Sequence, residues 1–186
     1  MLLLGTIASS RLAAAGDFES IATVSLSSSA ANVEFTSIPG TYTHLQIRFI
    51  ARSARSGFAD DPIDMQINTD TGANYATHSL NGDGSTATAG AGASITSFRS
   101  GRMTAATAGA STFGVGVIDI LDYANTSKNR TVRTLTGEDN NSDGLVSLFS
   151  GLYQSTTAVT SIKLFSGTAN NFVQYSHFAL YGIKGA

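Results

Sequence analysis

The chain of 186 residues contains no cysteine and no tryptophan. Because cysteine is absent, the fold cannot rest on disulfides or on the redox state of its surroundings, although this absence identifies no compartment. Because tryptophan is absent, the chain lacks the aromatic side chain best suited to form a platform under a sugar ring. Disulfide-stapled scaffolds and tryptophan-lined sugar sites are therefore excluded.

Charged side chains are also scarce. They make up 13% of the chain, against about 25% in an average globular protein. Ser, Thr, Asn, Ala and the 19 glycines must therefore cover much of the surface, and such a surface suits assembly or extracellular exposure. The formal net charge of −2 gives no general attraction for a nucleic-acid backbone, so we expect no nucleic-acid partner.

No segment shows a long apolar stripe at helical spacing, so helices are expected to be short or absent. Alternation at period two is frequent instead, and it predicts about ten strands separated by turn-forming residues. This pattern predicts an all-β fold, a two-sheet antiparallel sandwich of the jelly-roll type. We expect one sandwich domain over residues 17–186, preceded by an extended arm over residues 1–16.

The last stretch of the chain, residues 171–184, has apolar side chains at both parities, including Phe178 and Leu180 on one face and Tyr181 and Ile183 on the other. A strand with one face in water would alternate more cleanly. The stretch therefore predicts a long strand in the interior of a sheet, with Phe178 and Leu180 in the core.

Two patterns predict local connections. Residues 18–26 and 32–37 both alternate apolar and polar side chains on either side of a short polar link, which predicts a hairpin. The stretch at residues 85–94, STATAGAGAS, has low complexity and little to bury. It predicts a loop that is mobile or ordered by a partner.

Residues 111–123 carry apolar side chains in two successive phases. Val115 and Val117 share one parity, and Ile118 and Ile120 then take the other. Such a change of phase is typical of a strand that bends between the faces of a curved sheet, so it predicts a β-bulge or bend.

The first sixteen residues resemble a secretory signal only superficially. No basic residue precedes the apolar run, and Arg11 interrupts it, so we interpret the segment as an arm and not as a signal peptide or a membrane span. Its apolar tip needs a surface to bury it, on this domain or on a neighbouring subunit. The tip consists of Leu2, Leu3, Leu4 and Ile7.

No catalytic motif is present. The three histidines, His44, His78 and His177, are not spaced as paired metal ligands or as HExxH. The serines include no GxSxG turn, although a Ser, a His and an Asp from distant segments could still meet in space. We expect no enzyme and no cofactor.

One turn has the spacing of a calcium loop. Asp139, Asn141 and Asp143 stand at ligand spacing and Gly144 at the position of the sharp turn, but Ser150 replaces the glutamate expected at position twelve. The flanking segments are also predicted strands, not helices. A plain β-turn is the interpretation that fits better, with Asp139, Asn141 and Asp143 as the single candidate metal site.

Basic and aromatic residues offer possible contacts. Alternation places Arg48 and Arg52 on one face of a strand, where they form either a solvated face or a contact with an acidic subunit. Arg55, Arg99 and Arg102 complete the basic clusters. Four aromatic residues are candidate platforms for a sugar, or alternatively part of the core: Phe58, Tyr75, Phe98 and Tyr153.

Sequence segments along nearly the whole chain resemble those of a recurrent family of virion proteins of tailed bacteriophages. They include FESIATVSL, EFTSIPGTYTHLQIRFIARS, GANYATH, NGDGS, VIDILDYANTSKNRTVRTLTG and FVQYSHFALYGIKG, after the short lead LLGTIASS. The resemblance implies a structural protein of the phage particle, described as tail, collar or capsid-associated, with no catalytic residue to transfer.

Within this resemblance two placements compete. One is a decoration or cement protein that binds the outer surface of the capsid through its arm, with Leu2, Leu3, Leu4, Ile7, Arg11, Arg48 and Arg52 as assembly contacts. The other is a tail or collar appendage whose loops bind a host glycan. An esterase-like or carbohydrate-active sandwich is a third, remote alternative. The expected partners are other virion proteins and further copies of the chain, with a trimer favoured and no membrane.

Overall fold

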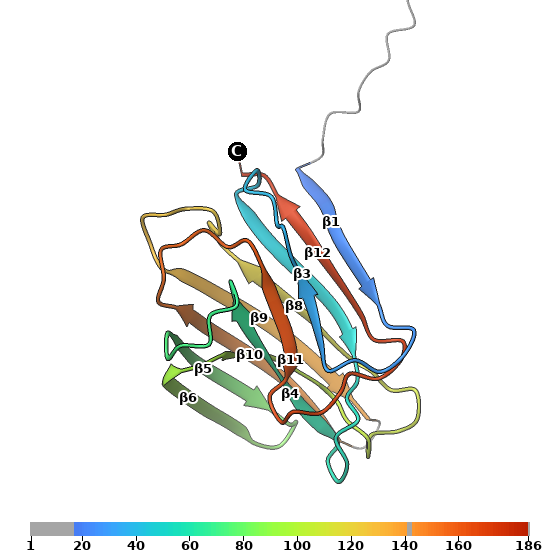
Figure 1. Ribbon diagram of the computed structural model, residues 1–186. Coiled ribbons are helices and arrows are strands. Elements are labelled where there is room, and N and C mark those ends of the chain that lie inside the picture. Colours follow the sequence, from blue (N-terminus) through green and yellow to red (C-terminus); the bar gives the residue numbers. More distant parts are fainter. Residues whose placement is uncertain (1–16, 141–142, 186) are drawn as a thin grey trace, which may run out of the picture.

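The computed structural model describes residues 17–140 and 143–185, and these form two antiparallel sheets (Figure 1). They contain no helix, and so none that could cross a membrane. The strands are β1 (Phe18–Ser25), β2 (Asn32–Phe35), β3 (His44–Ala51), β4 (Asp60–Ile67), β5 (Tyr75–Gly82), β6 (Ala87–Ile95), β7 (Phe98–Thr104), β8 (Gly114–Ile120), β9 (Arg130–Asp139), β10 (Gly144–Tyr153), β11 (Ile162–Ser166) and β12 (His177–Ile183).

The strand order is that of a jelly roll with two inserted hairpins. The large sheet has the order β1-β12-β3-β8-β9-β10-β5-β6 and the small sheet the order β2-β11-β4-β7. Apart from the insertions, successive strands alternate between the sheets, which is the jelly-roll pattern. The hairpins β5–β6 and β9–β10 both join the large sheet beyond β8 and double its width. The predicted sandwich is therefore confirmed.

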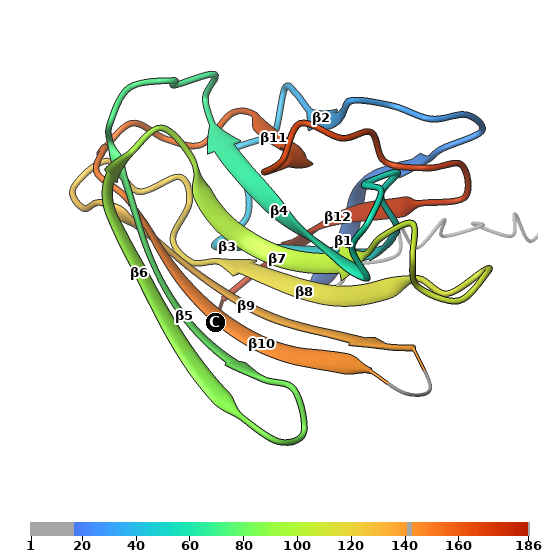
Figure 2. The same cartoon turned by 90° about the horizontal axis from the view of Figure 1, so that it is seen from below.

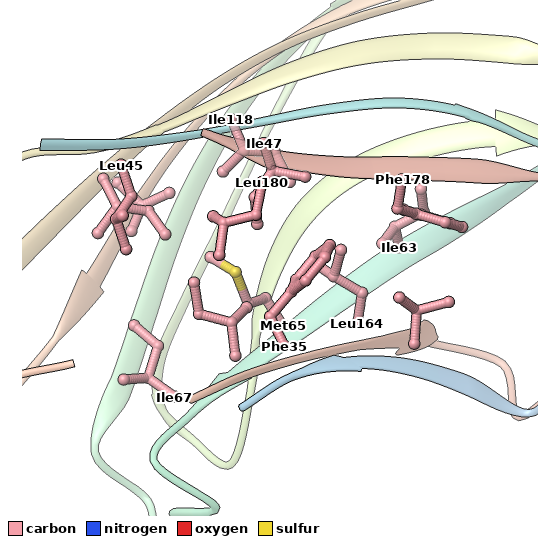
Figure 3. Close-up of a cluster of buried hydrophobic side chains, with 14 of the residues drawn as sticks. Phe35, Leu45, Ile47, Ile63, Met65, Ile67, Ile118, Leu164, Phe178 and Leu180 are labelled. Atoms are coloured by element: carbon pink, nitrogen blue, oxygen red, sulfur yellow. The ribbon is translucent and has the colours of Figure 1, made fainter. Parts of the chain in front are cut away.

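The large sheet curves around the small one (Figure 2). The core lies where the inner faces of β3, β8 and β12 meet those of β4 and β11 (Figure 3). Leu45 and Ile47 of β3 are fully buried, as their alternation predicts. Further members of the cluster are Phe35, Ile63, Met65, Ile67, Ile118, Leu164, Phe178 and Leu180.

The closing strand is shorter than expected. β12 begins at His177, because the chain turns at Tyr175, which has a positive φ of 72°. β12 pairs with β1 on one side and β3 on the other, and Phe178 and Leu180 are fully buried. The predicted interior position of the strand is confirmed, and the N-terminal half of the predicted strand is a loop.

The predicted hairpin between residues 18–26 and 32–37 is wrong. β1 pairs with β12 in the large sheet, whereas β2 pairs with β11 in the small one. The chain crosses from one sheet to the other between β1 and β2, as a jelly roll requires. Alternation within two neighbouring runs shows that both are strands, but it does not show that they pair.

The low-complexity run at 85–94 is also not a loop. Most of it belongs to β6, which pairs along β5 from Gly82↔Ala87 to Tyr75↔Ile95. Backbone hydrogen bonds supply this pairing, so small side chains do not prevent it. The side chains of β6 remain largely exposed at the edge of the sheet.

The predicted bulge within residues 111–123 does not occur. β8 alternates regularly, with Ile118 and Ile120 buried and with Val115 pointing to the other face, where its side chain is exposed. Register shifts lie in the pairings of β1 with β12, β4 with β7 and β5 with β6 instead. The two apolar phases of β8 therefore belong to two apolar faces of a regular strand.

Arg130 organises the loops beside it. The Arg130 side chain is fully buried, and it donates hydrogen bonds to carbonyl oxygens in both loops beside it, including Tyr123 O at 3.0 Å and Thr156 O at 3.1 Å. Burial lowers the pKa of its guanidinium. The acceptors are backbone carbonyl oxygens, which carry no full charge, so Arg130 holds these loops together through neutral acceptors.

Truncation of Phe178 tests the position of β12. Phe178→Ala should lower the free energy of unfolding by about 2–5 kcal/mol, the range for a large side chain removed from a packed core. Urea denaturation measures the change, with Thr23→Ala on the exposed face of β1 as a control that should leave stability almost unchanged. A loss below about 1 kcal/mol would show that the inner face of β12 is not part of the core.

Candidate assembly surface

The outer face of the large sheet carries an uncharged apolar zone across five neighbouring strands. Strand pairing aligns its residues in two adjacent rows. We name the following residues the outer apolar zone: Val115 and Val117 of β8, Leu135 and Gly137 of β9, Val146 and Leu148 of β10, Leu80 and Gly82 of β5, and Ala87 and Ala89 of β6. None of them has a polar or ionisable side chain.

The large side chains of the zone are open to solvent. Leu135 is 58% exposed, Val146 61% and Leu80 54%. Single exposed aliphatic residues are ordinary, but a contiguous apolar patch on a sheet face is typical of a protein contact. Figure 2 shows these strands on the convex side, away from the small sheet.

A hollow of about 460 Å³ lies at the β8–β9 end of this zone and reaches Arg48 and Phe49 of β3. It forms around Gly137, where no side chain fills the space between the neighbouring valines and leucine; a Cβ atom there would meet nothing within 4 Å. Its lining includes Val115, Val117, Leu135 and Val146. The hollow is suited to an aliphatic side chain of a partner.

The inner face of the same strands is mixed: beside the buried apolar side chains of Ile118, Val132 and Phe149 it carries a row of buried polar ones. Thr136, Ser147 and Asn81 stand opposite one another on β9, β10 and β5, and all three are buried. Within the described structure Thr136 Oγ1, Ser147 Oγ and Asn81 Oδ1 have no hydrogen-bond partner. Sandwich strands usually point apolar residues inward and polar residues outward. In the row of Thr136, Ser147 and Asn81 and in the outer apolar zone that pattern is inverted.

A polar network borders the zone. Asp119 accepts hydrogen bonds from Gln46 Nε2 at 2.9 Å and from Arg133 at 2.8 Å, and Arg48 Nε donates to Gln46 Oε1 at 2.9 Å. Asp119 and Arg133 form an ion pair, whereas Arg48 donates to the uncharged Gln46, so this border keeps a net positive charge. An apolar centre with a polar rim is the usual anatomy of a protein interface.

The predicted assembly contacts are not all within the described residues. Leu2, Leu3, Leu4, Ile7 and Arg11 lie outside them. Arg48 lies on the outer face, with its guanidinium 5.1 Å from the ring centroid of Phe18 and 5.6 Å from that of Tyr181.

Arg52 has different partners from Arg48, so the structure does not unite the two in one site. Its guanidinium donates hydrogen bonds of 2.7 to 3.3 Å to the loop between β7 and β8. The acceptors are the carbonyl oxygens of Ala106, Ala108, Gly109 and Thr112. This side chain holds a loop of its own chain.

The three histidines lie apart, on β3, β5 and β12. His177 Nδ1 lies 2.8 Å from Ser25 Oγ, but in the described part of the chain no carboxylate hydrogen-bonds to this histidine. His44 Nδ1 accepts a hydrogen bond from the backbone N–H of Asp122 at 3.0 Å. The structure thus assembles a Ser–His pair on an extended strand without the third group that orients the histidine in a hydrolase.

The calcium-like stretch forms the connection between β9 and β10. Asp139 ends β9 and Gly144 begins β10, while Asn141 lies outside the described residues. Asp143 Oδ1 accepts a hydrogen bond from Gly144 N at 2.9 Å. Among the described residues no group of three or more His, Asp or Glu side chains is placed to hold a metal ion.

The remaining basic and aromatic candidates separate into internal and exposed groups. Arg99 pairs with Asp64 at 3.4 Å, and Arg102 pairs with Asp60. Tyr75, Phe98 and Tyr153 are buried and pack on one another. Phe58 is exposed, with the guanidinium of Arg55 3.5 Å from its ring centroid.

Sequence reasoning missed the outer apolar zone. Its signal was present in β8, where Val115 and Val117 were interpreted as one arm of a bulge. It was also present in Leu135, Leu148 and Leu80, but only strand pairing brings these residues together. Searches with family models, among curated proteins and among solved structures found no match to the chain.

Glu138 is the most perturbed acid of the described residues. Burial, with Asp60 nearby, raises its pKa to about 8, and Arg102 opposes the shift. Its Oε2 atom is buried and has no hydrogen-bond partner among residues 17–140 and 143–185. The folded protein therefore holds the Glu138 proton over a range of pH in which the unfolded chain releases it.

This raised pKa predicts a pH dependence of stability. Between the unfolded pKa of 4.5 and about 8, the folded state binds more protons, so stability falls as pH rises. Glu138→Gln should remove this fall, making the variant more stable than the parent by about 1–2 kcal/mol above pH 8, after allowance for solvent screening. Urea denaturation from acid to alkaline pH measures it. Identical pH profiles for the two proteins would contradict the assignment.

Proposed function

We propose that this chain is a non-enzymatic structural protein of a bacteriophage virion, a decoration or cement protein that binds the outer surface of the capsid and stabilises the particle. The observation that carries the proposal is the outer apolar zone, which no described part of the chain covers. The resemblance of the sequence to virion proteins of tailed bacteriophages supports the phage particle as the assembly.

Three physical features support an assembly role. The zone is apolar on a face that a free monomer exposes to water, and beneath it Thr136, Ser147 and Asn81 point inward. The two hairpins that build it add nothing to the jelly-roll order itself. Jelly rolls also serve as capsid domains, which supports the proposal by analogy of fold. On this view the inserted strands exist to present the zone.

A tail or collar appendage that binds host glycans is the second candidate. Exposed aromatic residues on adjoining loops favour it: Phe58 is 51% exposed and Tyr175 73%. Their loops are held together by the hydrogen bond from Ala54 N to Asn171 O at 2.9 Å. Aromatic rings exposed on joined loops offer stacking surfaces for sugars.

Deletion of residues 1–11 tests the attachment role of the arm. The described domain buries its core without these residues, so the deleted protein should keep its β-rich circular dichroism and thermal transition. It should no longer attach to particles, which co-sedimentation measures. Full attachment of a folded, deleted protein would contradict the role proposed for the arm.

The copy number on purified particles separates the two placements. A decoration protein follows the capsid symmetry and should be present in on the order of hundreds of copies, whereas a tail or collar holds about a dozen or fewer. Quantitative mass spectrometry against the major capsid protein gives this number. A low number would replace the decoration proposal with the appendage, and absence from particles would reject both.

A further inference from the structure

We propose that the outer apolar zone is the receptor for residues 2–7 of a neighbouring copy, so that copies join by exchanging their N-terminal segments. This inference rests on the assembly role proposed above and names the partner of the zone. Its occupant is the segment LLLGTI of the same sequence.

The chemistry of the segment matches the zone. Residues 1–10 contain no ionisable side chain, and four of the six residues from Leu2 to Ile7 are leucine or isoleucine. The zone likewise contains only Gly, Ala, Val and Leu. Burying aliphatic side chains against such a surface is favourable and leaves no charge without a partner. The hollow at Gly137 can accept one leucine of the segment.

The dimensions also agree. Five neighbouring strands at about 4.8 Å spacing place the outer strands of the zone about 19 Å apart. Six residues of extended chain span about 20 Å. A segment of this length can therefore lie across the strands from β8 to β6 and keep contact over the whole width of the zone.

The position of β1 favours a neighbouring copy as donor. The chain enters the large sheet at Phe18, whereas the zone is level with Thr23 and Ser25 at the other end of β1. This offset is about 17–23 Å along the strand. A chain that precedes Phe18 in line with β1 leads away from the zone of its own domain. Reaching that zone would require a reversal beside the cluster of Phe18, Tyr181 and Arg48.

Exchange of segments joins two different surfaces, so it is a head-to-tail contact. Such contacts close into rings when the rotation between copies allows it. Each copy of a ring donates one segment and accepts one, and closure adds avidity to a contact that is small by itself. A ring agrees with the trimer favoured from the sequence.

The experiment is complementation between two full-length variants, followed by sedimentation velocity. One carries Leu135→Asp and Leu148→Asp, which place charges in the zone but keep the segment. The other carries Leu3→Asp and Leu4→Asp, which spoil the segment but keep the zone. The wild type should be an oligomer, and each variant alone a monomer. An equimolar mixture should form pairs of one copy of each, because one intact segment meets one intact zone.

Matched controls separate this contact from general effects of charge. Thr131→Asp adds a carboxylate on the same face of β9 outside the zone, and Ser9→Asp with Ser10→Asp adds two outside residues 2–7; both proteins should remain oligomers. The replaced side chains of β9 and β10 are exposed, so circular dichroism should be unchanged. A Cβ atom at Gly137 meets nothing within 4 Å, so Gly137→Leu should place its side chain in the hollow and also abolish the oligomer.

Several results would overturn the inference. A monomeric wild type would show that no exchange occurs. If the variant with Leu3→Asp and Leu4→Asp remained an oligomer, the zones of two copies would pack on each other. If the variant with Leu135→Asp and Leu148→Asp remained an oligomer, the segment would bind elsewhere. Because this test uses the isolated protein, it is independent of particle binding: oligomers of a protein absent from particles would reject the virion role but keep the exchange.

Discussion

The structure depends on the contact between the inner faces of two sheets of unequal width. Leu45 and Ile47 on the large sheet pack toward Ile63 and Met65 on the small one, and all four are fully buried. Apolar burial of this kind is the main favourable contribution to folding. A four-stranded sheet can cover only part of an eight-stranded one, so the β9–β10 and β5–β6 hairpins extend beyond the main core.

This unequal width explains the inverted pattern of the extension. Thr136 and Ser147 point inward under β7, while Leu135, Val146 and Leu148 point outward. Val132 and Phe149 on the inner face of these strands are buried in the monomer, but the apolar side chains on the outer face stay in water. The sequence of these strands becomes physically reasonable when a second protein surface covers the outer face, and the same assumption accounts for the hollow at Gly137 and for the uncharged tip of the chain.

The local pattern of apolar and polar residues predicts a strand well where one face of that strand is buried in the core. Alternation in β3 predicts that Leu45 and Ile47 share a buried face, and the apolar excess of β12 predicts an interior strand; the structure confirms both. Pairing was harder, because the partner of β1 lies at the far end of the chain and β6 is held by backbone hydrogen bonds that its small side chains do not signal. The outer apolar zone combines residues from five strands, so it becomes visible only when the register is known.

The most direct test of the central claim is the solvent exposure of the zone in the assembled protein. Methyl NMR with a soluble paramagnetic agent reports the exposure of the Leu80, Leu135 and Leu148 methyl groups. In the oligomer these signals should be protected, and in a variant that cannot associate they should broaden as strongly as those of the exposed Leu121. Methyl groups of the zone that broaden equally in both proteins would show that the zone faces water in the assembly and would contradict the account.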